Sequence, residues 1–131
     1  MPWLLSKFHL GRVAYSLIRE HFDKPKRSAH WAVVRRVHLR KHPRCAACGS
    51  KRFRQVHHIV PFTDRPLLEL DPTNLITLCM GKHECHLHLG HGGDYHYFNP
   101  AVSKNCRVIL RHPEKRRDIE INARIFRRNT P

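Results

Sequence analysis

Two adjacent histidines, His57 and His58, stand in the apolar, strand-like run QVHHIVPF. Neighbouring side chains on a strand point to opposite faces of it. The two imidazoles therefore cannot serve one purpose from one side, and each needs partners of its own. A neutral imidazole can bind a metal ion, and it can also accept a proton near neutral pH. The pair thus indicates chemistry on both sides of one strand.

Five cysteines form a second reactive set, at positions 45, 48, 79, 85 and 106. An odd number in a reducing context favours metal binding over disulfides. Cys45 and Cys48 form a C-x2-C turn, whereas five residues separate Cys79 from Cys85. These four can converge from two loops as the sulfur ligands of a tetrahedral zinc ion. The alternative for Cys79 and Cys85 is burial as small apolar side chains, and Cys106 is left over.

The composition indicates a polyanionic partner. The chain has 131 residues, a length typical of a single domain, and a formal net charge of +15, which favours nucleic acid. Its 13 histidines concentrate between His57 and His96, which indicates a site. We find no long apolar run or lipidation motif for membrane binding, and the first twelve residues do not resemble a signal peptide. We therefore expect a cytoplasmic protein without a membrane partner.

Three sections of the chain must position these residues. Residues 1–42 predict two helices, over 9–22 and 29–42, with Ser28 as the N-cap of the second and His42-Pro43 as its end. Residues 43–100 predict strands over 53–59 and 75–79, followed by a helix over 82–91 that glycines end. Residues 101–131 form a basic extension, helical in parts and divided by Pro113. The expected fold class is α+β.

Four motifs occur in a specific order: HPRCAACG, then VHHIVPF, then LELDPTNLITLC, and finally CHLHLGH. In this order they resemble the HNH nucleases of the ββα-metal fold, and more narrowly the small HNH proteins of phage and bacterial genomes. The resemblance covers about residues 31–100. It implies a small ββα-metal core with a zinc knuckle, flanked here by N- and C-terminal helices.

The resemblance also implies roles for the residues around the histidine pair. His58 would be the general base and His57 a ligand of the catalytic metal, which agrees with the alternation of side chains along a strand. Asn74 would hold the base-bearing segment by hydrogen bonds across the loop. A DPTN turn favours an asparagine at this position in any case.

The last histidines depart from the family pattern. His86 follows the final knuckle cysteine as expected, but His91 comes five residues later instead of four and would lie past the end of the helix. We expect His91 to be the third metal ligand, with His88 as the alternative. The wide spacing of the second cysteine pair also leaves His83 as a substitute for one of those cysteines. His96 is expected to be structural or to face DNA.

These roles predict a metal-dependent DNA endonuclease that nicks one strand or cuts both. Three imidazoles suit Mn²⁺, Ni²⁺, Co²⁺ or Zn²⁺ better than Mg²⁺, although Mg²⁺ is abundant in cells. A cation near the phosphate would stabilise its charge, with Arg54, Arg65 and Lys82 as candidates. DNA contacts are predicted for those three and for Arg35, Arg36, Arg116 and Arg117. The alternative for single residues of the arginine-rich helix is a solvated face.

Two other functions stay open. A noncatalytic zinc-knuckle module that binds DNA or RNA would explain the charge and the cysteines, but not the order of the histidines and Asn74. A subunit of a phage packaging or defence complex is compatible with cleavage as well as with its absence. A homodimer would bring together two active sites and could cut both strands.

Overall fold

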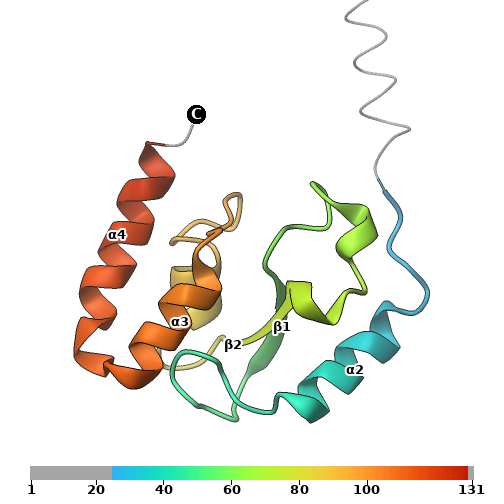
Figure 1. Cartoon of the computed structure of the whole chain (residues 1–131), viewed down its shortest axis with the longest axis horizontal. Coiled ribbons are helices and arrows are strands. Elements are labelled where there is room, and N and C mark those ends of the chain that lie inside the picture. The colour runs from blue at the N-terminus through green and yellow to red at the C-terminus, as the bar shows by residue number, and fades with distance from the viewer. Residues whose placement is uncertain (1–24, 130–131) are drawn as a thin grey trace, which may run out of the picture.

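The structure, a computed structural model, describes residues 25–129 and places a two-stranded sheet between helices (Figure 1). Helix α2 spans Trp31–Lys41, strand β1 Arg54–His58 and strand β2 Leu75–Cys79. Two 3₁₀ turns, η1 (Pro66–Leu68) and η2 (Pro72–Asn74), lie between the strands. After β2 follow a π-helical turn, η3 (His86–Gly90), helix α3 (Val102–Arg111), a 3₁₀ turn, η4 (Pro113–Lys115), and helix α4 (Arg116–Arg128).

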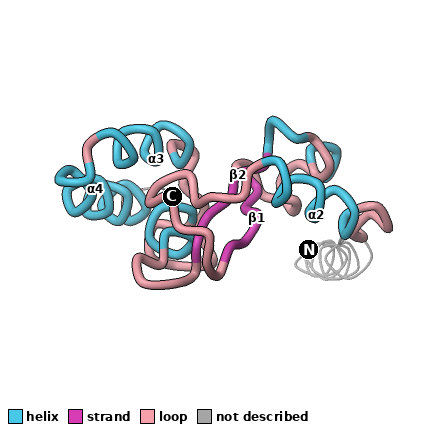
Figure 2. Tube along the Cα trace, turned by 90° about the horizontal axis from the view of Figure 1, so that it is seen from below, coloured by secondary structure: helices cyan, strands magenta, loops and turns pink. Residues whose placement is uncertain are grey.

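The two faces of the sheet are covered by different elements. Strands β1 and β2 pair antiparallel, with His58 opposite Leu75. Helix α2 covers the face that carries His58, because the ring of Trp31 lies 4.6 Å from the His58 ring. The turn η3 covers the other face, where the rings of His57 and His86 are 5.1 Å apart. Two perpendicular views place the sheet between α2 and the α3–α4 pair (Figure 1, Figure 2).

The buried core is built around cysteines. Its members are the cysteines at 45, 79, 85 and 106, each at most 1% exposed, together with Ala47, Leu78, Leu89, Val102 and Ile109. Four of the nine buried residues of this cluster are cysteines, so large apolar side chains make up only part of it. An ion that joins the cysteine loops would therefore contribute a large part of the stability.

The α+β class is confirmed, and β2 has the predicted ends. The predicted helix over residues 82–91 is wrong in type, since only the single turn η3 forms and glycines with positive φ follow at Gly92 and Gly93. Ser28 does not cap α2. The N-cap residue is His30, and its backbone N–H donates a hydrogen bond to the hydroxyl of Ser28. Pro113 separates α3 from α4 as predicted. The helix predicted over residues 9–22 lies outside the described residues.

Helices α3 and α4 form a hairpin with an unbalanced charge. Lys104, Arg107, Arg111 and Lys115 line one groove of about 340 Å³. Within residues 25–129 none of these four forms an ion pair with a carboxylate. The hairpin therefore presents a concentrated positive surface, which we call the hairpin basic groove. No helix in the described part of the chain is long and apolar enough to span a membrane.

Candidate metal centre and active site

Three histidines converge on the face of the sheet that η3 covers. Ligand nitrogens of His57, His86 and His91 all lie within 4.8 Å of one another. The three ring centroids are 4.8 to 5.1 Å apart, and the rings meet nearly at right angles. His88 lies outside this group, because its ring contacts Glu84 and Arg124. The structure thus brings together the three histidines that the resemblance implied.

The π-helical turn explains why His91 reaches this group. Hydrogen bonds in a π-helix run from residue i to i+5, so residues five apart share a side of the turn. His86 and His91 have this spacing. The turn also approaches the sheet closely, because a Cβ at Gly90 would lie 3.0 Å from Cε1 of His57 and 3.1 Å from Cδ1 of Leu78. A larger residue at position 90 would therefore have to displace the His57 ring or the Leu78 side chain.

The group has the hydrogen bonding of a metal site. Nδ1 of His91 lies 2.6 Å from the carbonyl oxygen of Tyr97. A carbonyl can only accept, so Nδ1 carries the proton and Nε2 keeps its lone pair, as is usual for metal-binding imidazoles. Nε2 of His57 and Nδ1 of His86 are buried without a partner among the described residues. Buried polar atoms normally have partners, so this arrangement fits a bound ion.

The imidazoles of His57 and His86 are in the form that binds a metal. Burial, and then the neighbouring histidines, lower the pKa of His57 to about 3. Burial and the adjacent His91 lower the pKa of His86 to about 4. The two imidazoles are therefore neutral at pH 7, which is the state that a metal ligand requires.

His58 has a different environment on the other face of the strand. Its Nε2 lies 3.0 Å from the backbone carbonyl oxygen of Glu69, to which it must donate, so the lone pair is on Nδ1. The ring packs against Trp31 at a tilt of 32°. Burial lowers the pKa of His58, although the hydrogen bond to Glu69 opposes this shift. His57 and His58 line one cleft of about 610 Å³, so an oriented neutral imidazole borders the same cleft as the histidine group.

Asn74 fastens the segment that follows His58. Its Oδ1 accepts from the N–H of Val60 at 2.8 Å, and its Nδ2 donates to the Val60 carbonyl at 3.0 Å. Nδ2 also donates to the carbonyl of Leu68 at 3.2 Å. The side chain is buried. Asn74 therefore ties together the two ends of the loop after β1, besides closing the turn η2.

Four cysteines meet in the core. Ligand atoms of Cys45, Cys48, Cys79 and Cys85 all lie within 4.8 Å of one another, and all five cysteines are free. The sulfurs of Cys48 and Cys79 are 3.5 Å apart. Disulfide sulfurs would be about 2.05 Å apart, whereas ligands of tetrahedral zinc with Zn–S bonds of about 2.3 Å stand about 3.8 Å apart. The group is thus positioned to hold a metal ion, and His83 is exposed outside it.

The structure does not bring the three cations predicted for the phosphate to the cleft. The guanidinium of Arg54 instead donates to the backbone carbonyls of Leu39 and Pro43. Arg65 and Lys82 are exposed and do not line the cleft. Strand alternation explains Arg54, because it shares a face with His58 and lies against α2.

Arg27, which sequence reasoning missed, lines the cleft instead. Among the described residues that line it, Arg27 is the sole arginine or lysine. Its guanidinium is 3.2 Å from the buried Glu69 carboxylate and lies over the rings of Trp31 and Phe62. Arg27 precedes the predicted helix and belongs to no motif, so no sequence signal distinguishes it from the other basic residues. His96 also lines this cleft.

The remaining predicted DNA contacts differ in exposure. Arg36 and Arg117 are exposed, whereas Arg35 is half-buried and donates to the side-chain oxygen of Gln55. Arg116 is largely covered, and its guanidinium faces the sulfur of Cys85.

Comparison with known proteins agrees with this geometry. Residues 45–92 match the family model described as HNH endonuclease. The matched segment contains all four clustered cysteines, the three clustered histidines, His58 and Asn74. No curated protein and no solved structure matches the chain.

Proposed function

Residues 45–92 are an HNH endonuclease domain, and on that premise we propose that the protein is a metal-dependent DNA endonuclease. One observation carries the proposal: three clustered imidazole ligands and a fourth, separately oriented imidazole border one cleft. Metal ligation alone needs no fourth histidine with a free Nδ1. Hydrolysis of a phosphodiester needs both a metal site and a base beside it.

The residues of the cleft would divide the work as follows. Nδ1 of His58 accepts the proton of the attacking water, while the Glu69 carbonyl and Trp31 hold the ring in position. His57, His86 and His91 would hold a divalent ion, which supplies a Lewis acid for the phosphate and the leaving oxygen. Mn²⁺, Mg²⁺, Ni²⁺, Co²⁺ and Zn²⁺ are the candidates.

Arg27 is the cation best placed to contact the phosphate. It lines the cleft, is half-exposed, and keeps donors beyond the one used for Glu69. A fixed guanidinium stabilises negative charge that develops on the phosphate oxygens. Outside the cleft, the hairpin basic groove and the exposed Arg36 and Arg117 would contact the DNA backbone without selecting bases.

The four-cysteine group would hold a structural zinc ion. Cys45, Cys79 and Cys85 are buried in the core, Cys48 is partly buried against it, and the sulfurs are spaced for tetrahedral ligation. Burial raises the pKa of Cys48 to about 11, so this sulfur would lose its proton only when a cation binds. The ion would join the loop before β1 to the end of β2 and the start of η3.

The decisive experiment is cleavage of supercoiled plasmid by the wild type and by His58→Ala, with Mg²⁺, Mn²⁺, Co²⁺, Ni²⁺ and Zn²⁺ supplied separately. We expect nicked or linear product from the wild type and a large loss in His58→Ala. The exposed His83 provides a control, because His83→Ala removes the same group at a position that lines neither the cleft nor the hairpin basic groove. Plasmid that is bound but left intact under every metal would favour the noncatalytic zinc-knuckle module.

A further inference from the structure

The guanidinium of Arg116, the first residue of α4, faces the cysteine group. Nη1 and Nη2 each lie 3.5 Å from Sγ of Cys85, and Nη1 lies 2.9 Å from Oε1 of Glu120. The side chains of Arg116 and Glu120 are only 17% and 19% exposed. Arg116 is therefore held between a sulfur and a carboxylate and uses both arms of its fork, a geometry that lysine does not reproduce.

The Cys85 sulfur has fewer other hydrogen-bond donors than the Cys45 sulfur, so the Arg116 contact matters more to it. The C-x2-C turn directs backbone N–H groups, including those of Ala47 and Cys48, to the Cys45 sulfur. Among the described residues, the hydrogen-bond partners of the Cys85 sulfur are the side chains of Arg116 and Cys45. Cys85 is fully buried, so water does not replace a missing donor.

The contact should strengthen when the cysteines bind an ion. A thiol is a weak hydrogen-bond acceptor, whereas hydrogen bonds between charged groups are the strong ones. Four thiolates outweigh the charge of one divalent ion, and excess charge in a buried site is costly unless it is compensated. Arg116 is a cation placed directly at one of the four sulfurs.

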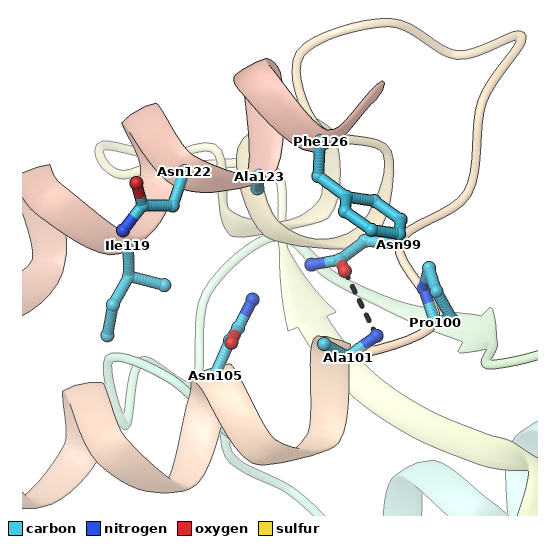
Figure 3. Close-up of a pocket in the computed structure, with 8 residues that line it drawn as sticks. All are labelled: Asn99, Pro100, Ala101, Asn105, Ile119, Asn122, Ala123 and Phe126. Carbon is cyan, nitrogen blue, oxygen red and sulfur yellow. Dashed lines mark hydrogen bonds between the residues drawn. The ribbon is translucent and has the colours of Figure 1, made fainter. Parts of the chain in front are cut away.

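Arg116 attaches the first turn of α4 to the cysteine group, whereas Arg124 and Arg127 attach the later turns to His88 and Asp94. Ala123 is the one buried residue of α4. An open groove of about 280 Å³ lies between α3 and α4, lined by residues of both helices (Figure 3).

We propose that Arg116 is an outer-sphere residue of the cysteine metal site, so that retention of the ion and docking of α4 depend on each other. The inference rests on the structural metal of the proposed function and not on DNA cleavage. If the inference holds, α4, which follows the matched HNH segment, forms part of the zinc knuckle.

The test compares Arg116→Gln, Arg116→Lys and Arg117→Gln in the full-length zinc-loaded protein. Arg117 is the matched control, because it is the adjacent exposed arginine of the same helix. The rate of zinc release to an excess of chromogenic chelator is measured. We expect Arg116→Gln to release zinc about tenfold faster than the wild type, in the range typical of outer-shell partners. Arg116→Lys should fall between them, and Arg117→Gln should match the wild type.

A second measurement uses only the wild type and so does not depend on the folding of a variant. Hydrogen exchange of residues 116–128 is followed before and after zinc is removed. We expect α4 to lose protection when zinc leaves. Three outcomes would each overturn the inference. They are equal rates of zinc release from Arg116→Gln and Arg117→Gln, unchanged protection of α4 after zinc removal, and a wild type that holds no zinc. DNA cleavage is not a readout here, so failure of the proposed nuclease activity is distinguished from failure of this inference.

Discussion

Nε2 of His58 donates to the backbone carbonyl oxygen of Glu69 across 3.0 Å, which makes Nδ1 the basic atom of the ring. The side chain of the same Glu69 accepts from the backbone N–H of Ser28 at 2.9 Å and from Arg27 at 3.2 Å. One buried residue therefore fixes the orientation of the proposed base through its backbone and anchors the cleft arginine through its carboxylate.

The first prediction concerns pH. A general base works when neutral, so cleavage should fall as the pH drops through the pKa of His58. Burial lowers this pKa, which moves the fall to a pH below the ordinary histidine value of about 6.5. His58→Ala should be slower by about 10² to 10⁴ and should lose this dependence. A pH–rate profile at saturating metal checks both, and a wild-type midpoint above that of free imidazole would contradict the assignment.

The second prediction separates two histidines of one turn. His91→Ala should lower the affinity for the catalytic metal, because His91 belongs to the three-histidine group, and added metal should restore part of the activity. His88→Ala is the matched control, since its ring contacts Glu84 and Arg124 outside the group. Isothermal titration with Mn²⁺ or Ni²⁺ measures the affinity. Equal metal affinity in the two variants would remove His91 from the site.

The third prediction concerns Asn74. Asn74→Ala leaves the N–H and carbonyl of Val60 without their partner, and each unsatisfied buried group costs about 1–3 kcal/mol. We expect a clear loss of thermal stability together with slower cleavage, because the segment after His58 is released. Asn105→Ala is the control, because the Asn105 side chain forms no hydrogen bond with the described residues. Thermal melts that shift equally for both variants would count against this role.

The fourth prediction concerns the cysteines. Cys48→Ser should lower the zinc content and the melting temperature markedly, because structural zinc contributes about 10 kcal/mol or more of apparent binding energy in small domains. Cys106→Ala should keep its zinc, since Cys106 is buried in the core but does not belong to the four-cysteine group. Metal analysis of the purified variants distinguishes them. Loss of zinc from Cys106→Ala alone would require a different ligand set.

The fifth prediction concerns the charge. Replacing Lys104, Arg107 and Arg111 together by alanine should weaken DNA binding without changing the chemical step. The slope of log affinity against log salt should fall by about 0.9 for each phosphate that the protein no longer neutralises. Binding is measured in a His58→Ala background so that the DNA stays intact. Lys51→Ala with Arg52→Ala, two exposed cations outside the groove, provides the control. An unchanged slope in the triple variant would exclude the hairpin basic groove as a DNA surface.

The sequence by itself determined the features that local chemistry controls. The alternation of side chains along a strand was enough to place His57 and His58 on different faces. The sulfur spacing pointed to the four cysteines that meet in the core, and Pro113 marked the break between α3 and α4. The strand ends at residues 75 and 79 were also correct, because the apolar run LITLC is short and follows a turn motif.

Only the tertiary structure decided what the long side chains and the irregular turn do. An α-helical period leaves His91 out of line with His86, and the π-helical turn that aligns them depends on close packing of Gly90 against His57. Arg27, Arg54 and Arg116 have the same chemistry, yet one lines the cleft, one binds backbone carbonyls, and one faces Cys85. Composition and spacing do not separate these arginines, because the contacts that distinguish them join distant residues. Arg54 meets Pro43 across 11 residues of chain, Arg116 meets Cys85 across 31, and Arg27 meets Glu69 across 42.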